Sequence, residues 1–514
     1  MEGSFCVKKA ICLLIALSLL LSLGACAANK PSSRPQEVVS GGGAIHFSSS
    51  EADREPAVPE NPPAVPEEEG PSYAPIPSSS TPSYASSSIS YPSSSSSSSS
   101  SAALPPSSSS SVAPAPSSTS SSSRPPVSPS SSASSVPEDP ASQEDEEELE
   151  EEDPVVPSSG DEVRGIWLSY LDLGPLLSGK SESAFTASIG VVMDNIKNLG
   201  LNTVYAQVRP FGDALYYSDY FPSSYLFTGT EGEIGSQPYD ALEIMIQAAH
   251  SRGLRIEAWL NPYRVRTSNK ALSSDNPARQ MLDTGDALRY DGGIYYNPGS
   301  AAARQLILDG VREIVANYDV DGIHFDDYFY PPNASASFDQ ATYQASGSSK
   351  SLAAWRREQV DILVKAVYNA VGTGTIFGIS PAGNSQNNYN ALYCDVEKWL
   401  TTPGYVDYIC PQVYFGFNNS VKPYKSTAKE FNDMITQSGV KLYVGLAAYK
   451  IGDAQQGGSE WVQNTDIMAR QVEYARTLSR YGGFALYRYD SLFNPAGGVS
   501  GAVKKEIANL KDIL

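Results

Sequence analysis

Two adjacent aspartates, Asp326 and Asp327, are the residues whose types and spacing point most directly to chemistry. They end a short apolar run that starts at Gly322, and an aromatic cluster and Pro331 follow them. This pattern is typical of a barrel strand that carries acids to the rim where catalysis occurs, although a turn-forming Asp pair is the structural alternative. Two close carboxylates repel each other, which raises the pKa of at least one and suits a general acid. We expect Asp327 to donate the proton and Asp326 to act as its electrostatic or positioning partner. The reverse assignment stays open.

Strand alternation adds a geometric expectation for the pair. Successive side chains of a strand point to opposite faces, so Asp326 and Asp327 cannot both point the same way if both continue the strand. One should face the barrel axis, while the other turns into the loop.

The elements that must position these acids are short β-branched or aromatic runs that alternate with amphipathic stretches. Eight such units predict an α/β fold, a (β/α)8 TIM barrel, over residues 161–514. An open doubly wound sheet is the alternative, but it normally carries a glycine-rich phosphate loop, and the sequence has no GxGxxG or P-loop motif. The expected strands are 163–169, 203–209, 255–260, 322–326, 376–380, 408–414, 442–447 and 483–488, and the expected helices are 183–199, 239–252, 301–318, 352–371, 391–400, 427–437, 461–481 and 501–514.

Polar and aromatic side chains follow most of the expected strands, where the loops of a barrel form its working face. Amide, guanidinium and carboxylate groups bind sugar hydroxyls, and flat aromatic faces cover the C–H faces of a pyranose ring. The set therefore predicts a groove that binds a polysaccharide. The residues expected to line it are Gln207, Arg209, Asp213, Trp259, Asn261, Tyr263, Arg264, His324, Tyr328, Asn384, Gln412, Tyr414, Tyr449 and Arg488.

Other chemistries fit the sequence less well. The chain has three histidines, and only His324 lies near an expected strand end, which excludes a zinc site of several histidines. No GxSxG elbow is present, so a Ser-His-Asp triad would depend on a histidine inside a strand. We expect no metal and no cofactor. No basic stripe is present, which argues against nucleic acid as a partner.

The amino-terminal residues have the pattern of a targeting segment. Lys8 and Lys9 precede an apolar run, and residues 23–26 (LGAC) resemble a bacterial lipobox. We expect residues 1–25 to be a lipoprotein signal peptide and Cys26 to carry lipid, so that the protein is extracytoplasmic and anchored to the cell membrane. Ordinary signal cleavage, with Cys26 incidental, is the alternative.

Residues 26–160 are rich in Ser and Pro and then in acids, with few large apolar residues. Such a segment cannot bury enough surface to offset its ordering entropy, so we expect a disordered stalk. Much of the formal net charge of −21 comes from it. Beyond the stalk, Cys394 and Cys410 could form one disulfide or remain buried free thiols, and both readings stay open.

Several blocks of the folded part resemble the glycosyl-hydrolase-like family 10 domain. The resemblance spans about Glu162 to the Tyr487 region and implies a (β/α)8 barrel related to glycoside hydrolases. A bacterial member acts on peptidoglycan glycan strands stripped of stem peptides, which implies a hydrolase of a cell-envelope polysaccharide with N-acetylhexosamine units here. The catalytic role of Asp326 and Asp327 is a hypothesis that rests partly on other glycosidase barrels. The blocks are 164–168 (RGIWL), 202–210 (NTVYAQVRP), 212–216 (GDALY), 258–264 (AWLNPYR), 297–299 (NPG) and 321–331 (DGIHFDDYFYP).

Glycoside hydrolysis usually needs a second group besides the acid. Glu257, Asp213 and Asp490 are candidates, and the N-acetyl group of the substrate, held by Asp326, is the alternative. A glycan-binding lipoprotein without catalysis, or a scaffold of the envelope, remains the rival function.

Overall fold

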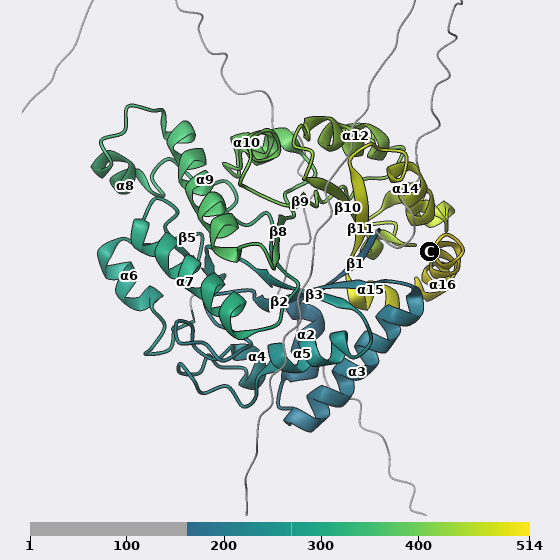
Figure 1. The fold of residues 1–514 in the computed structure, drawn as a ribbon, viewed down its shortest axis with the longest axis horizontal. Helices are drawn as coiled ribbons and strands as arrows, with labels where there is room; N and C mark the ends of the chain where they lie inside the picture. Colours follow the sequence, from purple (N-terminus) through teal and green to yellow (C-terminus); the bar gives the residue numbers. More distant parts are fainter. Residues whose placement is uncertain (1–161, 269) are drawn as a thin grey trace, which may run out of the picture. The chain divides into compact units, whose positions relative to one another are not determined.

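The computed structural model describes residues 162–268 and 270–514, which all fall in one compact unit. Eight parallel strands close into a barrel in the order β1-β11-β10-β9-β8-β7-β3-β2 (Figure 1). The expected (β/α)8 barrel is therefore confirmed, while the expected signal peptide, Cys26 and the stalk lie outside the described residues. The strands are β1 (Val163–Leu168), β2 (Thr203–Arg209), β3 (Arg255–Leu260), β7 (Gly322–Phe325), β8 (Ile376–Ile379), β9 (Tyr408–Ile409), β10 (Lys441–Ala447) and β11 (Tyr481–Tyr487).

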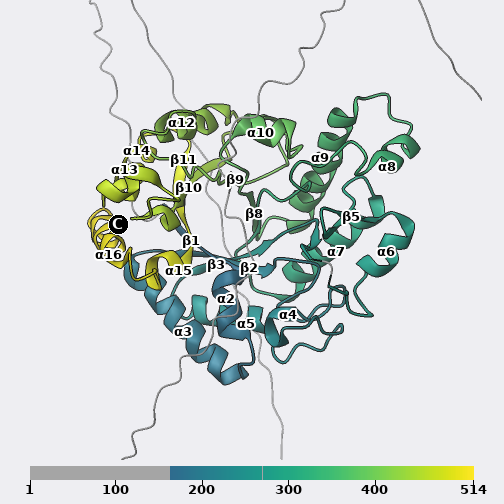
Figure 2. The ribbon, with the colours of Figure 1, turned by 180° about the vertical axis from the view of Figure 1, so that it is seen from behind.

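Helices surround the barrel in both views (Figure 1, Figure 2). Within the described part, none is long and apolar enough to cross a bilayer. The longer helices are α3 (Glu182–Leu199), α5 (Ala241–His250), α7 (Ala301–Asn317), α9 (Leu352–Val371), α12 (Tyr424–Met434), α14 (Ile467–Ala475) and α16 (Ser500–Lys511). The shorter ones are α2 (Tyr170–Leu177), α4 (Tyr225–Thr228), α6 (Ala278–Thr284), α8 (Gln340–Ala345), α10 (Ser385–Asn390), α11 (Val396–Thr401), α13 (Gly458–Gln463), α15 (Tyr489–Phe493) and the 3-10 turn η1 (Ala448–Lys450).

Two of the expected helices are interrupted. The stretch expected at 391–400 starts only at α11, because Tyr393 has a positive φ of 57° and Asp395 caps the helix by accepting from Lys398 N. The expectation of one helix over 461–481 was wrong, since α13 ends at Gln463 and Asn464 is extended before α14 begins.

A small antiparallel sheet was not expected from the sequence. It consists of β4 (Arg264–Arg266), β5 (Ala287–Tyr290) and β6 (Gly293–Tyr296) in the order β4-β6-β5, inserted after β3. Asp291 and Gly292 join β5 to β6, both with positive φ. An Asp-Gly pair suits such a two-residue hairpin turn, because it tolerates left-handed backbone.

The barrel interior differs from the shell around it. Aliphatic side chains of the strands face the helices, while an aromatic cluster that includes Trp167, Tyr205 and Tyr408 fills the axis. Two glycines make room for large side chains here. A Cβ on Gly378 would lie 2.0 Å from the Tyr408 ring, and one on Gly322 would lie 2.8 Å from the Glu257 side chain.

Candidate active site

Asp326 lies at the carboxyl end of β7, where three N–H groups hold its carboxylate. Trp259 Nε1 and Asn261 Nδ2 donate to Oδ2 at 3.1 and 2.5 Å, and the backbone N of Tyr328 donates to Oδ1 at 3.1 Å. The side chain is buried, with 3% of its surface exposed, and burial raises its pKa. Such donors stabilise the charged form and lock its direction. Asp326 is therefore a fixed acceptor near the barrel axis.

A chain of hydrogen bonds between side-chain amides orients the donors around the Asp326 carboxylate. The backbone N of Tyr170 donates to Gln207 Oε1 at 2.9 Å, which leaves Gln207 Nε2 to donate to Asn261 Oδ1 at 2.7 Å. Asn261 must then turn its own amide nitrogen toward Asp326. Gln207 and Asn261 are almost fully buried, so neither offers a surface to a sugar hydroxyl. The expectation of direct substrate contact is corrected for both: they position Asp326.

Asp327 follows Asp326 in the loop after β7, beyond the end of the strand. Gln412 Nε2 donates to its Oδ1 at 3.1 Å and to the carbonyl oxygen of Ser380 at 3.2 Å. The side chain is half-buried. Burial and the neighbouring Asp326 carboxylate raise the pKa of Asp327 to about 7. A partly accessible carboxyl that keeps its proton near neutral pH can act as a general acid.

Arg264 supplies positive charge beside both carboxylates. Its guanidinium lies over the rings of Phe211 and Tyr328, at 4.8 and 4.6 Å from their centroids. Its Nε donates to the carbonyl oxygen of Pro210 at 3.0 Å. The charge of Arg264 opposes the rise in the pKa of Asp326 that burial causes. The arginine thus limits how strongly the pair holds protons.

Aromatic side chains lie after the strands on the other side of the barrel. The Tyr414 ring lies 5.9 Å from that of Tyr449 and 5.7 Å from that of Tyr487. All three residues are half-buried. Tyr487, which ends β11, was not among the expected site residues, although its place at a strand end was the available signal. Asn384, also half-buried, caps α10 by accepting from Asn387 N at 3.3 Å.

Arg488 is engaged by acids rather than free for a sugar. It pairs with Asp172 and lies 3.3 Å from Oδ2 of Asp490. Arg488, Asp490 and Tyr449 contribute to the lining of a cavity of about 270 Å³. Asp490 therefore sits in an ion-pair cluster beside β11.

Three expected groove residues are buried outside the barrel axis, which corrects their assignment. The Arg209 guanidinium lies over the Phe221 ring at 4.5 Å, because the register between β2 and β3 shifts at this point. Such a bulge redirects the side chains that follow it. Asp213 accepts from Tyr225 N at 2.9 Å, and Tyr263 has no exposed surface. None of the three can touch a ligand at the mouth without rearrangement.

His324 belongs to a buried chain of hydrogen bonds below the mouth. Trp167 Nε1 donates to His324 Nε2 at 3.1 Å, so the ring proton is assigned to Nδ1, which lies 2.7 Å from the Tyr408 hydroxyl. That hydroxyl donates to Glu257 Oε2 at 2.5 Å. Burial lowers the pKa of His324 to about 3 and raises the pKa of Glu257 to about 8. His324 is thus a neutral interior residue, which corrects its assignment to the substrate groove.

Glu257 is too deep to serve as the second acid. It precedes Asn261 by four residues on the same strand face, which places it on the order of 13 Å below the level of Asp326. Asp213 and Asp490, the other two expected second carboxylates, are engaged by Tyr225 N and by Arg488.

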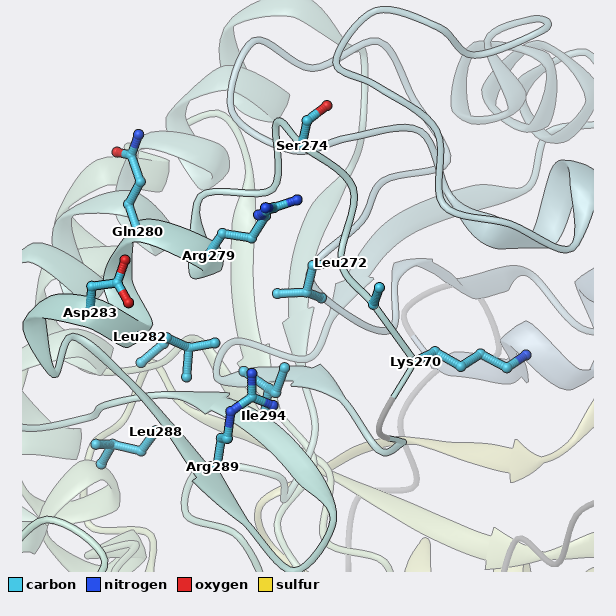
Figure 3. A pocket seen from close by; sticks show the side chains of 12 residues that line it. Lys270, Leu272, Ser274, Arg279, Gln280, Leu282, Asp283, Leu288, Arg289 and Ile294 are labelled. Carbon is cyan, nitrogen blue, oxygen red and sulfur yellow. The ribbon is translucent and has the colours of Figure 1, made fainter.

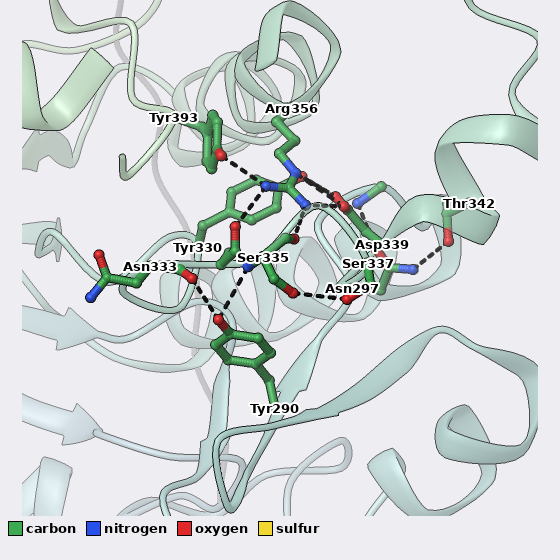
Figure 4. A network of polar contacts seen from close by, with 12 residues as sticks. Tyr290, Asn297, Tyr330, Asn333, Ser335, Ser337, Asp339, Thr342, Arg356 and Tyr393 are labelled. Atoms are coloured by element: carbon green, nitrogen blue, oxygen red, sulfur yellow. Dashed lines mark hydrogen bonds and ion pairs between the residues drawn. The ribbon is translucent and has the colours of Figure 1, made fainter. Parts of the chain in front are cut away.

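The loop that carries the aspartates is anchored by a polar network shown in Figure 4. Arg356 on α9 pairs with Asp339 at 2.5 Å and donates to the carbonyl oxygens of Ala334 and Ser335 at 3.1 and 2.7 Å. Arg356 and Asp339 are almost fully buried. The Tyr290 hydroxyl ties β5 to the same loop by donating to the carbonyl oxygen of Asn333 at 2.5 Å. Sequence reasoning missed Arg356, because it lies in a helix far from any strand end.

Two further points concern metals and cysteines. Among residues 162–268 and 270–514, no three His, Cys, Asp or Glu side chains gather in a way that could hold a metal ion. Cys394 and Cys410 are both buried and free, so the open question of a disulfide is answered for this pair.

Comparison with known proteins assigns the chain to a family. A family model described as glycosyl hydrolase-like 10 matches residues 162–463. The chain belongs to this family. Its relatives in the glycosyl hydrolase-like 10 family include the glycosyl hydrolase DigH of Escherichia coli (strain K12), which is 33% identical over 377 residues, 66% of this chain and 85% of the relative. The glycosyl hydrolase YngK of Bacillus subtilis (strain 168) is 35% identical over 319 residues, 57% of this chain and 62% of the relative.

Solved structures similar to this glycosyl hydrolase-like 10 member are more distant. The PgaB (BpsB) glycoside hydrolase domain from Bordetella bronchiseptica has 14% identity and a TM-score of 0.46, over 68% of this chain and 99% of that one. The endo-1,4-beta-mannanase from Rhizomucor miehei has 13% identity and a TM-score of 0.45, over 68% of this chain and 94% of that one.

Proposed function

We propose that the chain is a glycoside hydrolase that cleaves a cell-envelope polysaccharide containing N-acetylhexosamine units, such as peptidoglycan glycan strands. Membership of the glycosyl hydrolase-like 10 family supports the reaction class. The observation that carries the proposal is the unequal environment of the two aspartates. Asp327 has a pKa near neutrality and a partly open side chain, whereas Asp326 is locked by three N–H donors. Paired acids with different environments are suited to different roles.

Asp327 is the proton donor to the leaving oxygen in this proposal. The three carboxylates expected for the second role, Asp213, Glu257 and Asp490, are each engaged in other contacts. The carbonyl oxygen of the 2-acetamido group then attacks the anomeric carbon as the glycosidic bond breaks. Asp326 accepts the acetamido N–H and holds the group in line. Water, deprotonated by the Asp327 carboxylate, opens the cyclic intermediate.

A glycan-binding protein that does not cut remains the second candidate, and the observation that favours it is that all three expected second carboxylates make other contacts. Purified protein is incubated with isolated glycan strands, and new reducing ends are counted. We expect the wild type and the exposed control Asp512→Asn to produce ends, and Asp327→Asn to produce almost none. Retention of strands without new ends by the wild type would establish binding alone.

The role of the acetamido group has its own test. De-N-acetylated strands are offered to the wild type alongside intact ones. We expect cleavage of the intact strands only, because the deacetylated sugar lacks the attacking carbonyl. Equal cleavage of both would refute participation by the substrate while leaving Asp327 as the acid.

We also propose that Cys26 carries a lipid that holds the barrel at the outer side of the cell membrane. The lipobox-like residues 23–26 support this. Metabolic labelling with a fatty acid should mark the wild type and not Cys26→Ala, and label on both would refute the anchor.

A further inference from the structure

The β4-β5-β6 insertion carries a hollow of about 890 Å³ that does not include either aspartate of the pair. Figure 3 shows side chains from α6, β5, β6 and the preceding loop around it. Apolar side chains form part of its lining, among them Leu272, Leu282 and Ile294. This volume is within the range of pockets that accept small organic ligands, so there is room for sugar units.

Positive charge dominates the lining. Lys270, Arg279 and Arg289 contribute to it, against a single acid, Asp283. Within the described part of the chain, these three cations make no side-chain hydrogen bond or ion pair. Figure 3 shows Arg279, from α6, and Arg289, from β5, around the same hollow, with Leu272 between them in this view. Guanidinium groups without a protein partner at one hollow favour a carboxylate or phosphate, because each can bind such a group through paired N–H donors.

The insertion that carries the hollow is hydrogen-bonded to the loop that follows the two aspartates. Arg289 directly precedes Tyr290, whose hydroxyl donates to the carbonyl oxygen of Asn333 at 2.5 Å (Figure 4). Asn333 follows Asp327 by six residues, which span at most about 22 Å even when fully extended. A glycan of several sugar units that occupies the barrel mouth can therefore extend toward the hollow.

We propose that this hollow is an anion-binding subsite for the glycan, in which Arg279 and Arg289 bind an anionic substituent of a sugar remote from the cleaved bond. The subsite rests on the proposed function for its role in catalysis, although binding can be measured without cleavage. A carboxylate on the sugar and a phosphate on the sugar share the required chemistry. The apolar lining contacts the C–H surface of the same sugar.

Binding is tested in full-length protein that carries Asp327→Asn, so that cleavage does not intervene. The probes are an N-acetylhexosamine oligosaccharide with carboxylates on alternate sugars, the same oligosaccharide with its carboxylates converted to neutral methyl amides, and a phosphate-bearing analogue. The charge is removed with R279Q/R289Q. The matched control is K504Q/K505Q, two exposed lysines on α16 across the barrel from α6 (Figure 1).

We expect R279Q/R289Q to raise the Kd of an anionic oligosaccharide about tenfold, roughly threefold for each arginine. The Kd of the amidated probe should not change, and K504Q/K505Q should bind like the parent. Increasing salt should weaken parent binding toward the level of the double variant, because exposed charges are screened. Whichever anionic probe shows the dependence identifies the source of the charge.

Equal affinity of the parent for the charged and the amidated probes would overturn the subsite. So would binding of anionic lipid vesicles that depends on the two arginines while no oligosaccharide does. Failure of the proposed function has a different signature: wild-type protein makes no reducing ends, yet anionic glycan binding still depends on Arg279 and Arg289. Cleavage that R279Q/R289Q leaves unchanged on anionic strands would refute the subsite and keep the hydrolase.

Discussion

Replacing Glu257 by Gln should change how the stability of the barrel depends on pH. Glu257 has no exposed surface, and only one of its oxygens is hydrogen-bonded, by the Tyr408 hydroxyl. Burial disfavours the charged form and raises its pKa from 4.5 to about 8. Gln has nearly the same shape, accepts the Tyr408 hydrogen bond through its amide oxygen and does not titrate.

The direction of the change in stability with pH follows from whether the folded or the unfolded state binds the proton of Glu257 more tightly. A pKa that is higher in the folded state means that folding favours the protonated acid, so this stabilisation is fully present below about pH 4.5 and is lost as pH rises through about 8. At about 1.36 kcal/mol for each pH unit between those two values, the loss is on the order of 3–5 kcal/mol. Glu257→Gln should lack this loss, so its stability should exceed that of the wild type increasingly from pH 5 to pH 8.

Urea unfolding followed by tryptophan fluorescence at several pH values measures the difference between the two proteins, which removes the contribution of other buried acids. The control Glu473→Gln makes the same chemical change at an exposed site on α14 and should follow the wild type. Because Glu257 lies well below Asp327, the variant should also keep its activity on glycan. A stability profile of Glu257→Gln that falls as steeply as that of the wild type would refute the reasoning, and loss of activity in a folded variant would reopen Glu257 as a catalytic acid.

Three more outcomes are expected. The kcat/KM of the hydrolase should decline above about pH 7, since Asp327 must hold its proton to act as the acid, and a pH–rate profile that stays flat to pH 9 would contradict this. Asn261→Ala removes one of the donors to Asp326 and should lower kcat about 10- to 100-fold with little change in KM. Steady-state kinetics measures both constants, and an unchanged kcat would mean that the chain of amide hydrogen bonds is structural only. Arg356→Met should lower the free energy of unfolding by about 3–5 kcal/mol, because it leaves the buried Asp339 carboxylate unpaired. Urea denaturation measures this loss against the control Arg312→Met, which removes an exposed arginine that also pairs with an aspartate.

Much of the barrel could be predicted because strand and helix periodicity is local. The expected strands match the observed ones within about two residues at most ends, except that β9 ends at Ile409 rather than at 414. The β4-β5-β6 sheet was missed, because its strands are only three or four residues long and its clearest signal is one pair, Asp291 and Gly292.

The candidate site, like the fold, could be predicted from the sequence only in part. The pattern of an apolar run that ends in two acids located Asp326 and Asp327 correctly at a barrel strand end. It could not show that Gln207 and Asn261 serve Asp326 instead of a ligand, because that depends on hydrogen bonds between different strands. Arg209 was misplaced since a shift in strand register is invisible in a list of residues.

The amino-acid sequence by itself determined that this chain forms a barrel of alternating strands and helices and that an acidic pair ends its fourth barrel strand. Both signals are local, because the hydrophobic period and the residue types at a strand end depend on neighbouring residues. Tertiary structure alone decided that three N–H donors hold Asp326 and that Asp327 remains partly accessible. It also decided that Arg279 and Arg289 line one hollow. Burial, donor direction and charge proximity arise only when distant segments meet, and these three quantities set the pKa of a carboxyl and the affinity of a site.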